Sequence, residues 1–171
     1  MRDFVDLLDR CPTGPRMEIG VLSGHSLAII ARHPGTTYGV DSFEGMAEPS
    51  KYDIVDGVNN YPKGRLSVPM SRVSSYLAAQ GVKASLVKGF VPEILGSLPQ
   101  GPFAFVHLDI DHYEPTLAAL DWLFPRMLPG GILLCDDWFE NQDFLAARAI
   151  NEVATSRPLT GTRGRKAWWV I

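Results

Sequence analysis

The residues best suited to chemistry are the aspartates that follow two short apolar runs, and they are Asp109, Asp111, Asp136 and Asp137. Such runs are typical of strands buried on both faces of a parallel sheet. Neighbouring parallel strands end at one edge, so these carboxylates are expected to converge, repel and raise one another's pKa. A hard cation such as Mg²⁺ prefers oxygen ligands and relieves that repulsion. We therefore expect a metal at Asp109, Asp136 and Asp137, with helix capping as the alternative, which suits Asp111 best.

A second candidate is the turn Met17–Ser26, which contains two glycines. Gly20 follows an apolar run and Gly24 opens a helical segment, and glycine lets a ligand approach the backbone closely. The spacing is Gly-x-x-x-Gly and not the Gly-x-Gly-x-x-Gly of dinucleotide sites, which disfavours a dehydrogenase. Asp41 closes the next strand, where a carboxylate can accept hydrogen bonds from both ribose hydroxyls. Together, the glycine turn and Asp41 favour a site for a nucleoside-bearing cofactor. The alternatives are that the turn is only a tight connection and that Asp41 only caps a turn.

These segments, with Asp41-Ser-Phe-Glu-Gly-Met46, 106–116 and 129–137, resemble the macrocin O-methyltransferase group. Its members are class I methyltransferases that use S-adenosylmethionine (SAM), need Mg²⁺ and methylate hydroxyls of sugars or other natural products. The acidic strand ends are also similar to those of catechol-type O-methyltransferases. The resemblance runs from the first predicted strand to the fifth. It implies SAM, Mg²⁺ and a small-molecule hydroxyl acceptor.

The resemblance also implies roles for individual residues. The metal ligands are expected to be Asp109, Asp136 and Asp137. The residues expected to contact SAM are Glu18, Gly20, Gly24, His25, Ser26, Asp41, Ser42, Gly89, Phe90 and Asp109. Among them, Gly89 and Phe90 follow the third predicted strand and are expected near the adenine.

Two histidines lie close to the acidic strand ends. His112 follows the first acidic pair and is our candidate for the general base, with Asp109 as the alternative. His107 lies inside an apolar run. We expect His107 to be a hydrogen-bonded core residue and not a catalyst.

The elements that must position these residues alternate along the chain. Strand-like runs at 16–21, 37–40, 84–87, 103–108 and 131–135 alternate with helical segments at 24–32, 68–80, 92–98, 114–124 and 142–155. The tail 158–171 has two short runs that flank Arg163-Gly164, as in a hairpin. We predict one α/β domain over 1–171, a doubly wound, mostly parallel, Rossmann-like methyltransferase sheet with a C-terminal antiparallel hairpin. Ligands of such sheets bind outside the carboxyl ends of the strands.

The segment 42–66 lacks periodicity and contains several glycines and prolines. It is long for a loop in a compact domain, which indicates a functional or a mobile segment. Because it follows the second predicted strand, it is expected to overhang the site. We interpret it as a lid, with a disordered loop as the alternative.

Composition excludes several classes of protein. The net charge is −3, and the densest basic stretch, 163–166, suits a solvated turn, so a nucleic-acid partner is not expected. The two cysteines, Cys11 and Cys135, have no metal or redox spacing. No apolar run approaches the roughly 18 residues of a membrane span, and 1–12 lacks a signal-peptide core. We expect a cytoplasmic protein without a membrane partner and leave a homodimer open.

Two other functions remain as alternatives. A metal-dependent hydrolase could use the acidic residues, but it would not need Gly20 and Asp41. A SAM-binding module without catalysis, such as a partner subunit, would need the glycine turn alone. SAM titration distinguishes a methyltransferase from a hydrolase, which should not bind SAM. Methyl transfer to sugars or catechols distinguishes an enzyme from a non-catalytic module.

Overall fold

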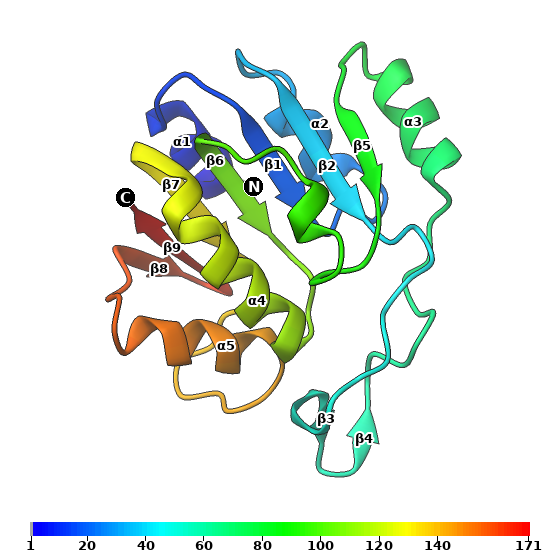
Figure 1. The fold of residues 1–171 in the computed structure, drawn as a ribbon, viewed down its shortest axis with the longest axis vertical. Helices are drawn as coiled ribbons and strands as arrows, with labels where there is room; N and C mark the ends of the chain where they lie inside the picture. The colour runs from blue at the N-terminus through cyan, green and yellow to red at the C-terminus, as the bar shows by residue number, and fades with distance from the viewer. Residues whose placement is uncertain (1) are drawn as a thin grey trace.

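The computed structural model describes residues 2–171 and is built on a seven-stranded sheet with the order β5-β2-β1-β6-β7-β9-β8 (Figure 1). The strands are β1 Arg16–Ile19, β2 Thr37–Asp41, β5 Ser85–Lys88, β6 Phe103–Leu108, β7 Met127–Cys135, β8 Gly161–Arg163 and β9 Lys166–Val170. Strands β5, β2, β1, β6 and β7 are parallel, and β9 is antiparallel to both β7 and β8. The predicted α/β class with its C-terminal antiparallel pair is confirmed.

Helices cover both faces of the sheet. One face packs against α4 (Tyr113–Leu123) and α5 (Leu145–Ala154), and Figure 1 shows α4 crossing in front of the strands. The other face packs against α1 (Arg2–Arg10), α2 (His25–Ile30) and, beside α2, α3 (Met70–Ala79). Short 3₁₀ turns lie at Leu95–Ser97 (η2) and Phe124–Arg126 (η3).

Strand alternation assigns each β1 side chain to one of these faces. Met17 and Ile19 belong to the core under α4 and α5. Glu18 lies between them in sequence and therefore points to the opposite face. There it meets His107 of β6, whose ring packs against Phe4 of α1 at 4.9 Å between ring centroids.

The helix α1 was not expected from the sequence. Phe4, Leu7 and Leu8 recur at helical spacing and are buried against the sheet. The cluster that they form includes Phe105 and Leu134 of the central strands. The helix α1 therefore completes the core on this face of the sheet.

Replacing Phe4 with alanine is expected to lower the free energy of unfolding by about 3 kcal/mol, because it leaves a cavity in that core. Phe4 is buried and packs edge-on against Phe105 at 5.7 Å. Asp6→Ala, at an exposed position of the same helix, is the control and is expected to change stability by less than about 0.5 kcal/mol. Urea unfolding of both variants measures the effect. A loss for Phe4→Ala no larger than that of the control would mean that α1 does not complete the core.

The segment 42–66 has secondary structure of its own. It contains a 3₁₀ turn, η1 (Lys51–Asp53), and the two-stranded ribbon β3 (Ile54–Val55) and β4 (Val58–Asn59). Figure 1 shows this ribbon beyond the carboxyl ends of the central strands, on the side of α4 and α5. None of the described helices combines the length and apolar character that crossing a membrane requires.

Candidate active site

A pocket opens over the carboxyl ends of β1, β2, β5 and β6, on both sides of the point where the strand order reverses. Much of its lining is apolar and includes Met46, Leu66 and Val91. The expected site residues in this lining are Gly20, Asp41, Ser42, Gly89, Phe90, Asp109 and His112. One cavity therefore joins the glycine turn to the first acidic strand end.

Gly20 must be glycine for two reasons. Its φ is +91°, in the region that favours glycine. A Cβ at this position would lie 1.7 Å from the carbonyl oxygen of Asp109. The end of β1 and the end of β6 are thus in direct backbone contact at the floor of the pocket.

Asp41 holds the glycine turn in shape. Its Oδ2 accepts hydrogen bonds from the amides of Val21 at 2.8 Å and Leu22 at 3.0 Å. Its Oδ1 accepts one from the amide of Phe43 at 2.7 Å. A carboxylate has about four acceptor sites, so backbone amides use most of them and leave about one for a ligand.

Ser42 and Gly89 shape the same side of the pocket. The Ser42 hydroxyl donates to the carbonyl of Gly45 at 2.7 Å and accepts from the amide of Glu44 at 3.0 Å, which fixes the start of the segment 42–66. A Cβ on Gly89 would lie 2.8 Å from the side chain of Ile94. A side chain at position 89 would therefore require Ile94 to move.

Four of the residues expected to contact SAM are not in the pocket lining of the described chain, namely Glu18, Gly24, His25 and Ser26. Glu18 is fully buried, and its Oε1 accepts a hydrogen bond from Nδ1 of His107 at 2.8 Å. His25 is exposed, packs on Tyr76 at 4.8 Å and shares a hydrogen bond with Ser23. Their roles toward SAM stay predictions.

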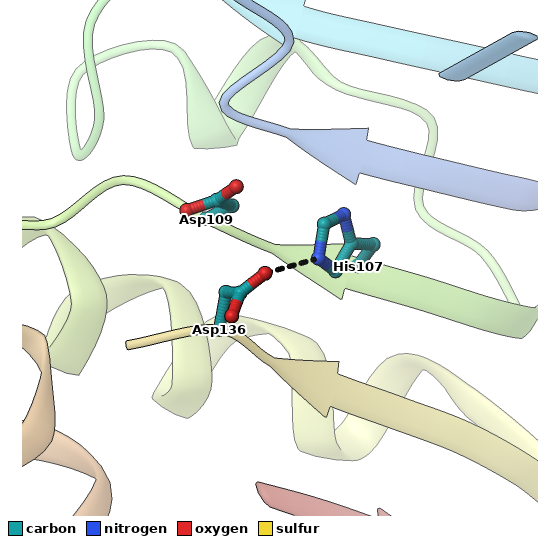
Figure 2. Close-up of side chains that lie close together, drawn as sticks. All are labelled: His107, Asp109 and Asp136. Atoms are coloured by element: carbon teal, nitrogen blue, oxygen red, sulfur yellow. Dashed lines mark ion pairs between the residues drawn. The ribbon is translucent and has the colours of Figure 1, made fainter. Parts of the chain in front are cut away.

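The aspartates converge in two overlapping groups. Ligand atoms of Asp109, Asp111 and Asp137 lie within 4.8 Å of one another, and so do those of His107, Asp109 and Asp136. Figure 2 shows Asp109 and Asp136 beside His107 at the ends of β6 and β7. The expected ligands Asp109, Asp136 and Asp137 are thus spread over two groups that share Asp109.

Protein cations contact two of these carboxylates. Lys166 pairs with Asp136, and Arg165 pairs with Asp137. His107 adds a further contact, 3.7 Å from its Nε2 to Oδ2 of Asp136. The basic stretch 163–166 was expected to be a solvated turn, but it balances the second acidic strand end.

This environment separates the pKa values of the acidic residues. Burial, followed by the charge of Asp109, raises the pKa of Asp111 to about 6. Burial also raises the pKa of Asp109. Burial opposes ionisation of Asp136, but its contacts with His107 and Lys166 prevail and lower its pKa to about 2.

His107 carries a proton in this arrangement. Burial disfavours its charged form, but the ion pair with Asp136 and the hydrogen bond to Glu18 outweigh burial and raise its pKa to about 9. A charged imidazole cannot accept a further proton, which disfavours His107 as a general base. His107 acts as a buried cation between two carboxylates.

The proposed base, His112, is buried but lines the pocket. Its Nε2 lies 3.2 Å from the carbonyl oxygen of Tyr61. A carbonyl only accepts, so Nε2 carries the hydrogen in this bond. In a neutral imidazole the other nitrogen, Nδ1, is then the basic one.

Sequence reasoning placed Asp111 outside the expected ligand set and did not identify Tyr61. Asp111 was best explained as a helix cap, but it lines the pocket with a φ of +58° and belongs to an acidic group. Its spacing of two from Asp109 was the available signal. Tyr61 lies near enough to Asp111 for that carboxylate to raise the pKa of its hydroxyl, after the larger effect of burial. It gave no signal, because it lies far away in an aperiodic segment.

The strand order, the pocket at its reversal point and the acidic strand ends define a Rossmann-like methyltransferase fold. The chain belongs to the family described as "Methyltransferase domain", whose model matches residues 17–138. The resemblance to class I O-methyltransferases is thereby confirmed.

Individual proteins extend this comparison. A Streptomyces olivaceus enzyme, 8-demethyl-8-(2,3-dimethoxy-alpha-L-rhamnosyl)-tetracenomycin-C 4'-O-methyltransferase, is 34% identical over 145 residues. The match covers 77% of this chain, which spans only 55% of that enzyme. The calicheamicin methyltransferase CalS11 is 26% identical with a TM-score of 0.77, over 99% of this chain and 79% of its own. The O-methyltransferase NovP is 20% identical with a TM-score of 0.80. The match covers 99% of this chain and 78% of NovP, and it supports the fold.

Proposed function

We propose that this protein transfers the methyl group of SAM to a hydroxyl of a sugar or another small natural product. The observation that carries the proposal is the single pocket in which Gly20 and Asp41 adjoin Asp109, Asp111 and His112. The first two residues suit a ribose-bearing donor, and the last three suit a hydroxyl that must lose a proton. The similar Streptomyces enzyme is named for 4'-O-methylation of a rhamnosyl group.

The proposed reaction is an in-line displacement at the methyl carbon of SAM. A C–O bond forms between the acceptor oxygen and the methyl carbon while the S–C bond of the sulfonium breaks. S-adenosylhomocysteine leaves, and the hydroxyl proton passes to a base. The main tasks of the protein are therefore to align the two reactants and to accept that proton.

Three residues are candidates to accept the proton. In His112 the hydrogen bond to Tyr61 leaves Nδ1 basic. In Asp111 the raised pKa of about 6 brings a carboxylate close to the pH range in which general bases are effective. We favour His112, and Asp109 is a further alternative.

We also propose that Mg²⁺ binds at the acidic edge. Oxygen donors of Asp109, Asp111 and Asp137 within 4.8 Å of one another fit a hard cation. A bound Mg²⁺ would stabilise negative charge on the acceptor oxygen and favour its deprotonation. Asp136 can join this set only by giving up its ion pair with Lys166.

Replacing His112 with glutamine tests its role as a base. The glutamine amide can still donate to the Tyr61 carbonyl but cannot accept a proton, so kcat is expected to fall by about a hundredfold. His33→Gln, at a histidine that pairs with Asp9, is the control and is expected to keep the wild-type kcat. Steady-state kinetics and SAM titration measure both variants. Wild-type kcat in His112→Gln would assign the base to another residue.

The function itself is tested with purified protein, SAM, Mg²⁺ and a panel of phenyl rhamnosides and catechols. Product mass spectrometry is expected to show one added methyl group on oxygen. Calorimetric titration with SAM separates the alternatives, because a hydrolase should not bind it. A protein that binds SAM but methylates no member of the panel would favour the non-catalytic module.

A further inference from the structure

Asp53 is a buried carboxylate in the segment 42–66, with 1% of its surface exposed. Its Oδ1 accepts a hydrogen bond from the amide of Tyr113, 60 residues away in sequence, at 2.8 Å. Its Oδ2 accepts from the amide and the hydroxyl of Ser50 at 2.8 and 2.7 Å. The segment predicted as a lid is therefore attached to the body of the protein by a buried side chain whose two carboxylate oxygens both accept hydrogen bonds.

The amide that Asp53 binds belongs to the first residue of α4. The amides in the first turn of a helix lack partners within the helix and need capping. His112, the residue at the N-cap position, makes no capping hydrogen bond with its side chain. Asp53 supplies the cap from a distant segment, and its negative charge suits the positive end of the helix dipole.

Further contacts hold the same junction together. The rings of Tyr52 and Tyr113 pack edge to face with 4.6 Å between centroids. The guanidinium of Arg148, from α5, lies 4.2 Å from the centre of the Tyr52 ring and 5.2 Å from that of Tyr113. The attachment is thus a packed joint between the segment and both helices on this face.

The joint lies directly beside the acceptor side of the pocket. Tyr113 follows His112, and both follow the acidic residues Asp109 and Asp111. On the other side of the joint, Tyr61 comes from the same segment as Asp53. Its carbonyl accepts from His112 at 3.2 Å, and burial and the nearby charge of Asp111 raise the pKa of its hydroxyl.

We propose that Asp53 is a positioning residue of this active site: by capping α4 it fixes the 109–112 turn and holds Tyr61 against Asp111 and His112. The capping contact is independent of the activity, but its kinetic consequence rests on the proposed function. Because the carboxylates and the base of the acceptor side sit on that turn, a shift of about 1 Å there can cost up to about a hundredfold in rate.

A purely structural anchor and a positioning residue predict different kinetics. Loss of an anchor lowers stability and weakens all ligands together. Loss of positioning lowers kcat/KM for the acceptor while SAM binding persists, because the residues expected to hold the nucleoside, Asp41 and Gly89, lie at the ends of β2 and β5. The split between acceptor kinetics and SAM affinity therefore distinguishes the two roles.

The test uses the full chain with Asp53→Ala, Asp53→Asn and the control Glu48→Ala, at an exposed carboxylate of the same segment. Alanine removes the acceptor for the Tyr113 amide, whereas asparagine keeps one carbonyl oxygen for it. The readouts are hydrogen exchange at the Tyr113 amide, SAM affinity by calorimetry, and kcat and KM for the best phenyl rhamnoside or catechol.

We expect Asp53→Ala to speed exchange at Tyr113 and to lower acceptor kcat/KM at least about tenfold, with the SAM Kd within about threefold of wild type. Asp53→Asn should recover most of the activity, and Glu48→Ala should match wild type. Wild-type kcat/KM in Asp53→Ala, or an equal loss of SAM affinity, would overturn the proposal. Failure of the proposed function looks different: the wild type itself would transfer no methyl group, while its Tyr113 amide would stay protected.

Discussion

Asp109→Asn is expected to lower kcat/KM for methyl transfer by about a hundred- to a thousandfold, the usual range for removing one electrostatic contact at a reacting centre. Asp109 is the carboxylate shared by both acidic groups, and it lines the pocket. Its replacement by a neutral amide of the same size removes charge at the place where the acceptor must lose a proton. The loss should appear mainly in kcat, because Gly20 and Asp41 remain to bind SAM.

The matched control is Asp121→Asn, at an exposed position of α4, which is expected to keep wild-type kinetics. EDTA separates the charge of Asp109 from the proposed metal. In the wild type, EDTA should reduce activity toward the level of Asp109→Asn, and it should reduce the variant no further. Activity of Asp109→Asn within about threefold of wild type would remove this residue from the catalytic machinery. Full wild-type activity in EDTA would exclude a catalytic role for the metal but not for Asp109.

Asp41→Ala is expected to weaken SAM binding by about 10- to 100-fold, because hydrogen bonds to a charged group contribute about 1.5–3 kcal/mol. The carboxylate would be lost both to a ribose and to the three backbone amides that it now holds. Asp41→Asn keeps one acceptor oxygen and should bind SAM with intermediate affinity. Calorimetric titration measures the three Kd values.

Two further measurements make the Asp41 result specific. Urea unfolding shows whether the alanine variant is folded at the titration temperature. Glu44→Ala, at an exposed carboxylate three residues further on that pairs with Lys88, is the control and should leave the SAM Kd unchanged. A SAM Kd in Asp41→Ala equal to that of wild type would show that the nucleoside binds elsewhere.

The parallel core of the fold could be predicted from sequence because its strands are short, continuous apolar runs. Phe103–Leu108 coincides with β6, and the other predicted strands agree to within a few residues. The longest discrepancy is β7, which begins at Met127 and so includes Pro129. The helix α1 went unnoticed because its four apolar residues are interspersed with charged ones over only nine positions.

Side-chain direction limited the prediction of the site. Glu18 lies in β1 next to the glycine turn, which made it an expected SAM contact. Strand alternation turns it away from Met17 and Ile19 and toward His107 on the neighbouring strand. The pairing of β1 with β6 decides this contact, and the register between strands so distant in sequence is not visible in either strand alone.

The residues contributed by other segments could not be predicted for a related reason. Lys166 and Arg165 reach the acidic edge because β9 pairs with β7 in antiparallel fashion, with Ala167 opposite Cys135. Asp53 and Tyr61 come from an aperiodic segment and contact the Tyr113 amide and His112, respectively. Local patterns reveal strands and helices, but contacts between distant segments depend on how the whole chain packs.

The central claim is that one pocket holds the nucleoside of SAM against Asp41 and directs its sulfur toward the acidic edge at Asp109. A crystal structure of the protein with S-adenosylhomocysteine and Mg²⁺ tests it most directly. We predict a ribose hydroxyl within hydrogen-bonding distance of Asp41, and the sulfur facing the edge formed by Asp109, Asp111 and His112. Density for S-adenosylhomocysteine outside this pocket, or with the ribose away from Asp41, would contradict the account.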